Sequence, residues 1–451
     1  MPGPRTRLAL VLLALGALLH LYRLGEPRRV VFDEVHFGGF VNNYLGDHRY
    51  FFDIHPPHAK LLIAGVAAAG GYRGEQPFED LDQAIEKTSP VLLRFVPALS
   101  GVLLPLVLFA LLLQLGATPA AAFLGGLAGA LDNALLLQTR VIALDGLLLL
   151  GTFGGLSAIL AARSAATRGR RTAFALLAGA LAGLAAGTKF TGLAALPLVG
   201  VVIAASLLPR PSWGALRRAA SLSVWALTGV VIVYGTGWLL HFALLTEPGG
   251  GYVWAVPTGD FLVDTIRIHG LMLASNYGLT APHPYASAWW SWPLMLRPVY
   301  YWNHDTAALY FVGNPAVWWG TTLGLLLVLA NGVLLRVTEL KLPGRASVWP
   351  RLLWVPLLGY AIALVPLMRI PRALFLYHYL TALLFALLAV VLWLDHVGFT
   401  RPGGVRSQRR SYAIVIAGLV LGFLVISPFT FSFVAAPDYR ELVFGLFPGW
   451  R

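Results

Sequence analysis

Residues 90–113, PVLLRFVPALSGVLLPLVLFALLL, form the apolar run that decides the fold, and Arg94 is their only charged residue. A helix needs about 20 consecutive apolar residues to cross a bilayer, so this run predicts a membrane-spanning helix. The whole chain has the same character, because 58% of its 451 residues are hydrophobic and only 12% are charged. These proportions exclude an ordinary soluble globular enzyme.

Similar apolar runs recur along the chain and predict an all-α integral membrane protein with about eleven spans. Eleven helices of about 20 residues would use roughly 220 positions, just under half of the chain. Cysteine is absent, which excludes disulfides, thiolate-zinc sites, iron–sulfur clusters and a cysteine nucleophile. The expected spans are residues 8–24, 90–113, 118–137, 141–162, 172–188, 190–208, 220–244, 316–335, 352–367, 373–393 and 412–434.

The formal net charge of +13 lies on one side of this topology. With a cytoplasmic N-terminus, 17 of the 33 Lys and Arg residues fall in cytoplasmic segments, against two acidic residues, Glu339 and Asp395. This is the positive-inside bias, so no nucleic-acid partner is needed to explain the charge. The topology therefore predicts a cytoplasmic N-terminus and an external C-terminus. The 17 basic residues are Arg5, Arg7, Arg163, Arg168, Arg170, Arg171, Arg210, Arg217, Arg218, Arg336, Lys341, Arg345, Arg351, Arg401, Arg406, Arg409 and Arg410.

Two external segments are long, residues 25–89 and 245–315. Irregular backbone must leave the hydrocarbon, so these loops can hold chemistry. We expect two short helices in the first loop, over residues 34–45 and 58–69, too short to span. The aromatic residues of 283–302 are typical of a membrane interface, but aromatic faces also stack on sugars and hold isoprenoid or peptide chains, and the composition does not separate these uses. Residues 1–451 are predicted to form a single integral domain.

Ionisable or polar residues gather at the external ends of the expected spans. Charges in a bilayer cost about 2.5–3.5 kcal/mol at its centre, so each one needs a partner or a function. For any single residue the alternative is a snorkelling side chain or a structural ion pair, such as Arg140 with Asp145. Asp132 lies deeper, and the sequence assigns it no role. The converging residues are Arg94, Arg140, Asp145, Lys189, Asn314, Arg369, Arg372 and His378.

Asp33 and Glu34 are adjacent carboxylates where the chain leaves the first span. Neighbouring like charges resist joint ionisation, so the pKa of one can rise and make it a proton acceptor. The alternative is that Asp33 caps a helix that begins at Glu34. The first loop also holds four histidines, but their spacing fits no standard zinc site. An acidic pair, Asp80 and Asp82, is more typical of a solvated loop than of a metal site.

Six blocks, in order, carry a family resemblance: FDEVHF (32–37), FFDIHPPHAKLL (51–62), LLRFVPALSG (92–101), SAWWSWPL (287–294), GNPAVWW (313–319) and RALFLYHYLTAL (372–383). Together they resemble the protein O-mannosyltransferases, membrane glycosyltransferases of the GT-C class that use a polyprenyl-phosphate sugar. The chain departs from the family at His58 and Ala59, where Leu and Gly are more usual. Its second external loop also lacks the large soluble module of eukaryotic members, as in a minimal bacterial form.

The resemblance implies an inverting transfer of mannose from polyprenyl-phosphate-mannose to Ser or Thr hydroxyls of proteins. It implies Asp33 as the general base and Glu34 as its catalytic partner in the acceptor site, which Asp53 and His55 would shape. It also marks Arg94 as important for activity. We expect the donor phosphate to bind residues that are selected mainly because they lie at the external side of the membrane. These donor-phosphate residues are Arg94, Arg140, Lys189, Asn314, Arg372 and His378.

The resemblance also sets the expected partners and location. The partners are the donor lipid and secreted or membrane acceptor proteins, with the secretion translocon as a candidate route of delivery. The location is the bacterial plasma membrane. The reaction requires no cofactor or metal, although the resemblance leaves a role for a divalent metal open. The alternatives are a GT-C enzyme that modifies a lipid or cell-wall glycan, and a polyprenyl-lipid transporter without chemistry.

Overall fold

The computed structural model describes residues 3–208, 212–249, 257–278, 281–341, 352–400, 406–445 and 447–450, without the side chains of 335–341 and 406–408. Some of the basic residues used for the predicted sidedness therefore lie outside the described part of the chain. These are Arg210, Arg345, Arg351 and Arg401, together with the side chains of Arg336, Lys341 and Arg406.

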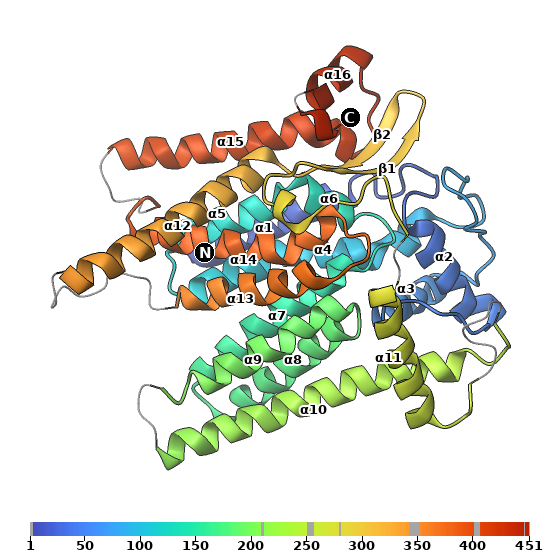
Figure 1. Ribbon diagram of the computed structural model, residues 1–451, viewed down its shortest axis with the longest axis horizontal. Helices are drawn as coiled ribbons and strands as arrows, with labels where there is room; N and C mark the ends of the chain where they lie inside the picture. The colour runs from blue at the N-terminus through green and yellow to red at the C-terminus, as the bar shows by residue number, and fades with distance from the viewer. Residues whose placement is uncertain are drawn as a thin grey trace.

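Seven helices in the described residues are long and apolar enough to cross a membrane. They run along one common direction in Figure 1. The stretch from residue 90 forms one of them, and its Arg94 lies in the first turns of that helix. The seven are α1 (Pro4–Leu21), α4 (Pro90–Gln114), α7 (Asp145–Ser164), α10 (Trp213–Leu244), α12 (Pro315–Lys341), α14 (Leu380–His396) and α15 (Arg406–Thr430).

The other four expected spans are also helical, but three of them are broken and one begins with a basic turn. The expected span 118–137 is divided because the side chain of Asp132 accepts a hydrogen bond from the Leu135 amide (2.9 Å) and so caps a new helix. Two more spans contain a 3-10 segment, and the fourth has a basic first turn. The count of eleven crossings therefore stays a prediction. The segments are α5 (Pro119–Ala130), α6 (Asn133–Gln138), α8 (Arg168–Ala186), η2 (Phe190–Ala194), α9 (Ala195–Ala204), α13 (Trp354–Leu364) and η4 (Val365–Arg369).

The bundle has enclosed helices and helices with exposed apolar faces. Helices α7 and α14 are buried on almost every side, as expected for helices that are apolar all round. Helix α8 approaches α10 closely, because a Cβ atom at Gly179 would collide with the backbone of Ala226. Small residues allow such contacts between membrane helices. By contrast, α10, α12 and α15 expose large apolar side chains, among them Val231, Leu326 and Leu421.

Short elements gather at one end of the bundle, on the right in Figure 1. The second predicted short helix forms over its expected residues, and the first continues as a π-helical turn. The sequence did not predict the antiparallel hairpin β1–β2 in the otherwise helical chain. These elements are α2 (Glu34–Asn42), η1 (Asn43–Asp47), α3 (His58–Ala69), α11 (Phe261–Gly278), η3 (Trp289–Ser291), β1 (Val299–His304), β2 (Ala307–Phe311), η5 (Leu376–Tyr379), α16 (Pro437–Gly445) and η6 (Pro448–Trp450).

A β-bulge in β1 ties the hairpin to the first loop. Tyr300 pairs with Tyr310 and Trp302 with Leu309, so Tyr301 has no partner in the ladder. Its carbonyl instead accepts a hydrogen bond from the Phe32 amide (3.1 Å). Its ring stacks on Phe32, with centroids 3.9 Å apart and planes inclined by 7°. Bulges often re-aim a side chain in this way, and this one fixes the residue before Asp33.

Candidate active site

A cavity of about 910 Å³ opens among α2, the segment before α3, α11 and the segment before α14. We call it the polar chamber. Six of the residues predicted for the site line it, from four separate parts of the chain. The six are Asp33, Asp53, His55, Lys189, Arg372 and His378.

The Asp33 carboxylate belongs to the polar chamber rather than to a helix cap. Asp33 occupies the N-cap position of α2, but its side chain makes no capping hydrogen bond. Burial raises the pKa of Asp33 to about 6, although the nearby charges of Lys189 and His36 oppose the rise. At neutral pH the carboxylate is therefore mostly ionised and able to accept a proton.

Lys189 reaches the chamber from the end of α8 and pairs with Asp145 at the start of α7. Its Nζ lies 2.9 Å from both carboxylate oxygens. The Gln138 amide donates a further hydrogen bond to Asp145 Oδ2 (2.6 Å), and the Tyr301 hydroxyl donates to Gln138 Oε1. The possible pair of Arg140 with Asp145 is therefore wrong, because Lys189 takes that place.

Asp53 and His55 also line the chamber, and both contact Lys60. Lys60 is buried in α3, forms an ion pair with Asp53 and donates to the His55 carbonyl (2.8 Å). Burial, together with the charges of Lys189 and Lys60, lowers the pKa of His55 well below its usual range. His55 is therefore neutral at physiological pH. The sequence reasoning missed Lys60, although a lysine in a short apolar helix is itself a signal.

Arg372 carries a hydrogen-bond donor that the described residues leave unused. Its Nε is buried and has no partner among them. An unpaired buried donor costs about 1–3 kcal/mol, so such a group is a marker of a ligand site. Arg372 and His378 both precede α14, and both line the chamber. His36 and Tyr377 also line it and were not chosen from the sequence.

A second cavity of about 380 Å³ adjoins the chamber, and we call it the apolar groove. It shares His55, Lys189, Arg372 and His378 with the chamber. The rest of its wall is mainly apolar and comes from η2, α9, α11, α13 and η4. Helix α11 contributes to both cavities, with Leu271 on the chamber and Leu273 on the groove. The four shared residues thus lie between the polar chamber and the apolar groove.

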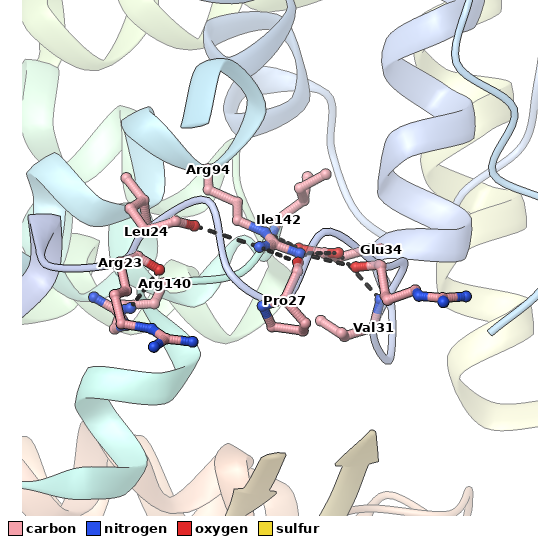
Figure 2. A network of polar contacts seen from close by, with 9 residues as sticks. Arg23, Leu24, Pro27, Val31, Glu34, Arg94, Arg140 and Ile142 are labelled. Carbon is pink, nitrogen blue, oxygen red and sulfur yellow. Dashed lines mark hydrogen bonds and ion pairs between the residues drawn. The ribbon is translucent and has the colours of Figure 1, made fainter. Parts of the chain in front are cut away.

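Glu34 and Arg94 form a closed node behind the chamber, which Figure 2 shows. Arg94 Nε and Nη2 donate to the two Glu34 oxygens at 2.8 and 2.9 Å. The same carboxylate accepts the amides of Val31 and Ile142. The remaining Arg94 donors go to the Leu24, Pro27 and Arg29 carbonyls. Glu34 is 0% and Arg94 1% exposed, and neither lines the chamber.

Two other expected phosphate ligands are also engaged elsewhere. The Arg140 guanidinium donates to the carbonyls of Leu19, His20 and Arg23, as Figure 2 shows for Arg23. The Asn314 side chain donates to the Leu131 and Leu419 carbonyls.

These contacts place four of the predicted site residues outside the lining of both cavities. Glu34, Arg94, Arg140 and Asn314 do not face either cavity, because backbone groups and ion pairs occupy their polar atoms. Asp132, to which the sequence assigned no role, has a structural one. Its carboxylate accepts hydrogen bonds from the backbone amide of Asn314 (3.1 Å) and from the Trp318 indole N–H (2.8 Å). It therefore joins α6 to the start of α12. In the described part of the chain, no group of three or more His, Cys, Asp or Glu residues is arranged to hold a metal.

Two protein families match the chain. Residues 10–245 match the family described as dolichyl-phosphate-mannose-protein mannosyltransferase. Residues 261–442 match the C-terminal four-TMM region of protein O-mannosyltransferase. Among curated relatives, protein O-mannosyltransferase 1 of Drosophila pseudoobscura pseudoobscura is 34% identical over 253 residues, 53% of this chain and 27% of that protein. The chain thus spans about a quarter of that relative's length.

Solved structures share the fold. A chain of the Saccharomyces cerevisiae protein O-mannosyltransferase Pmt1–Pmt2 complex bound to the sugar donor has a TM-score of 0.87 and 19% identity, covering 98% of this chain and 92% of that one. ArnT from Cupriavidus metallidurans bound to undecaprenyl phosphate has a TM-score of 0.53 and 14% identity, covering 95% and 76%. The fold is that of the GT-C glycosyltransferases. The family matches, the apolar helices and these folds together identify the chain as a multi-pass membrane protein that belongs to the protein O-mannosyltransferase family.

Proposed function

We propose that this chain transfers mannose from polyprenyl-phosphate-mannose to Ser or Thr hydroxyls of proteins at the external face of the membrane. One observation carries the proposal: the Asp33 carboxylate lines the same cavity as Lys189, Arg372 and His378. A proton acceptor and fixed cations are the two requirements of this reaction. The names of the relatives support the same chemistry, and one neighbouring structure holds a sugar donor.

Asp33 is the proposed general base. A Ser or Thr hydroxyl is a poor nucleophile, so a carboxylate within hydrogen-bond reach must take its proton as the new bond forms. Such assistance contributes typically 10²–10⁴ in rate. A pKa of about 6 suits this role, since the group is ionised at neutral pH yet more basic than an ordinary aspartate.

Lys189 and Arg372 are the proposed phosphate ligands, with His378 beside them. As the acceptor oxygen bonds to the anomeric carbon, the bond from that carbon to the phosphate oxygen breaks, and negative charge gathers on the polyprenyl phosphate. Fixed cations in a water-poor site stabilise such charge without rearrangement. The unused Nε donor of Arg372 supports this assignment. A single displacement of this kind inverts the anomeric centre.

The apolar groove is the proposed binding site of the polyprenyl chain. It adjoins the chamber and shares Lys189 and Arg372 with it, so a phosphate held there would have the sugar on one side and the lipid on the other. The ArnT structure, which is bound to undecaprenyl phosphate, supports a groove of this kind in the fold. Asp53 and His55 would shape the acceptor side of the chamber.

Glu34 and Arg94 take a positioning role in this proposal. Their node fixes the Val31 amide (3.1 Å) and the start of α2, and therefore the backbone that carries Asp33. The whole reaction would occur in one integral membrane unit, with a cytoplasmic N-terminus and an external C-terminus in a bacterial plasma membrane. The acceptors would be secreted or membrane proteins, delivered by the secretion translocon. The proposal requires no cofactor and no metal.

The test is to incubate the purified protein with labelled polyprenyl-phosphate-mannose and a Ser/Thr-rich peptide. We expect label on the peptide with wild type and none above background with Asp33→Asn, which should still bind donor. Label on a lipid or glycan acceptor instead would favour the related glycosyltransferase. Donor moved across a bilayer without loss of its sugar would favour a transporter.

A further inference from the structure

A third cavity, of about 590 Å³, lies between the β1–β2 hairpin and α16. We call it the hairpin cavity. Its described lining residues are shared with neither the polar chamber nor the apolar groove. Figure 1 shows α16 beside the hairpin, near the C-terminal end of the chain. The volume falls within the range of about 300–1,000 Å³ that is typical of small-molecule sites.

Aromatic rings form much of its wall. The Tyr285 and Tyr300 rings are nearly parallel, with centroids 6.4 Å apart and an interplanar angle of 17°. Tyr310 meets Tyr300 edge-on at 5.5 Å, and Phe444 packs on Tyr310 at 4.5 Å. Tyrosine combines an apolar face with a polar hydroxyl. The wall therefore suits a ligand that has both an apolar face and hydroxyl groups.

Charged side chains of both signs complete the cavity. Arg440 Nη2 donates to the Tyr300 hydroxyl and to Asn303 Oδ1, both at 3.2 Å. The carboxylates of Glu441 and Asp305 are exposed at the same cavity. One cation with two carboxylates favours neither an anionic nor a strongly cationic ligand. Donors and acceptors together instead favour a neutral ligand with several hydroxyls.

We propose that the hairpin cavity binds a hexose, and that its occupant is a mannosyl unit already attached to an acceptor protein. The second part of this inference rests on the proposed function. A hexose has an apolar C–H face that stacks on aromatic rings, and hydroxyls that pair with carboxylate and guanidinium groups. The site would hold a partly modified chain while another hydroxyl reacts.

The hairpin links this cavity to the reaction site. Tyr300 lines the hairpin cavity, whereas its neighbour Tyr301 turns through the bulge onto Phe32, next to Asp33. Strand β1 thus carries a residue that lines the hairpin cavity and, next to it, a residue that packs beside Asp33. Because the two cavities share no described lining residue, the bound sugar and the hydroxyl that reacts would belong to different residues of the acceptor.

The binding test uses methyl α-mannopyranoside as the probe, with saturation-transfer NMR on the full purified chain. We expect transfer from protein aromatic protons to the sugar in wild type. Tyr285→Ala and Glu441→Gln should each weaken binding at least tenfold. Asp438→Asn is the matched control, because it makes the same carboxylate-to-amide change on α16 outside the cavity. Absence of a signal in wild type at millimolar sugar, or a signal unchanged by both cavity variants, would overturn the proposal.

A second measurement separates this inference from the proposed function. Peptides with one mannose already in place should react faster than unmodified peptides with wild type. Tyr285→Ala should lose that preference while keeping the rate on the unmodified peptide. Asp33→Asn should abolish transfer but keep mannoside binding. If no peptide is ever modified, the proposed function fails, whereas the NMR result still decides the sugar site. Equal rates on both peptides in wild type would remove the acceptor role.

Discussion

Asp33 and Glu34 are neighbours in the chain, yet their carboxylates lie in opposite environments. Glu34 accepts two backbone amides and a bidentate guanidinium, and no part of it is exposed. Asp33 makes no capping bond and faces the polar chamber. Buried polar groups are normally paired, so the saturated carboxylate needs no further partner. The Asp33 carboxylate, which makes no capping bond, is available to accept a proton.

The same contrast separates the two main arginines. Arg94 uses its guanidinium on Glu34 and three carbonyls, whereas Arg372 keeps a buried donor without a described partner. Charge alone therefore does not distinguish a structural residue from a chemical one. For these two arginines, the number of donors already occupied makes the distinction. Four substitutions or measurements would break or sharpen this comparison.

The largest effect is expected at Asp33. Asp33→Asn should reduce mannosyl transfer by about 10²–10⁴, because the amide cannot accept the hydroxyl proton. Labelled transfer to peptide measures the loss, and binding of labelled donor controls for an intact site. Glu34→Gln, the matched change next door, should instead lower the yield of folded protein. Turnover above a tenth of wild type in Asp33→Asn would exclude this carboxylate as the base.

The second effect concerns stability. Arg94→Met should destabilise the protein by about 3–5 kcal/mol, because it leaves the buried Glu34 charge without its partner. Thermal unfolding in detergent measures the loss of stability, with the fraction of protein that stays monodisperse on heating as the readout. Arg29→Met is the control, since Arg29 lies 3.9 Å from Asp82 in a partly exposed pair, which is worth about 0–1 kcal/mol. Equal losses in the two variants would contradict the buried node.

A smaller effect is expected from Arg372→Lys. The substitution keeps the charge but removes the Nε donor and the planar fork, so donor binding should weaken by about 1.5–3 kcal/mol, or roughly 10- to 150-fold. Titration with labelled polyprenyl-phosphate-mannose measures it. The KM for the peptide should change little. An unchanged donor affinity would show that the unused donor of Arg372 does not meet the phosphate.

The smallest effect is a pH dependence. Burial raises the pKa of Asp33 to about 6, so the active, ionised form predominates from about one pH unit above that value and falls about tenfold for each unit well below it. The rate at low substrate should therefore rise between pH 5 and about 7 and then level off. Asp33→Glu should shift this limb if it retains measurable activity. A rate that is flat through this range would contradict the assignment of the pKa.

Much of the fold could be predicted because apolar runs and local signals act over short distances. Pro56 and Pro57 precede α3, and the predicted helix matches its bounds. The break between α5 and α6 could not be predicted, because a charge within an apolar run looks the same whether it caps a helix or serves a function. Asp132 does the former. The hairpin was hidden because its aromatic residues are equally typical of a membrane interface.

The site could be predicted in part for a related reason. Sidedness grouped Lys189, Arg372 and His378, which line the same cavity as Asp33. It failed for Arg140 and Asn314, because it specifies the end of a helix and not the direction of a side chain. Nor does it reveal which carbonyls are left free to accept a hydrogen bond. Such information arises only when distant segments pack, as Arg94 does with residues 60 to 70 positions away.

Under the proposed function, the wall shared by the polar chamber and the apolar groove would determine how the products depart. Because the four shared residues stand between the two spaces, spent carrier lipid would slip sideways into the bilayer while the modified protein moves outward into water. Neither product would have to pass the other. A fresh donor could then reload from the lipid side while the same protein chain stays engaged, so successive additions would need no full dissociation.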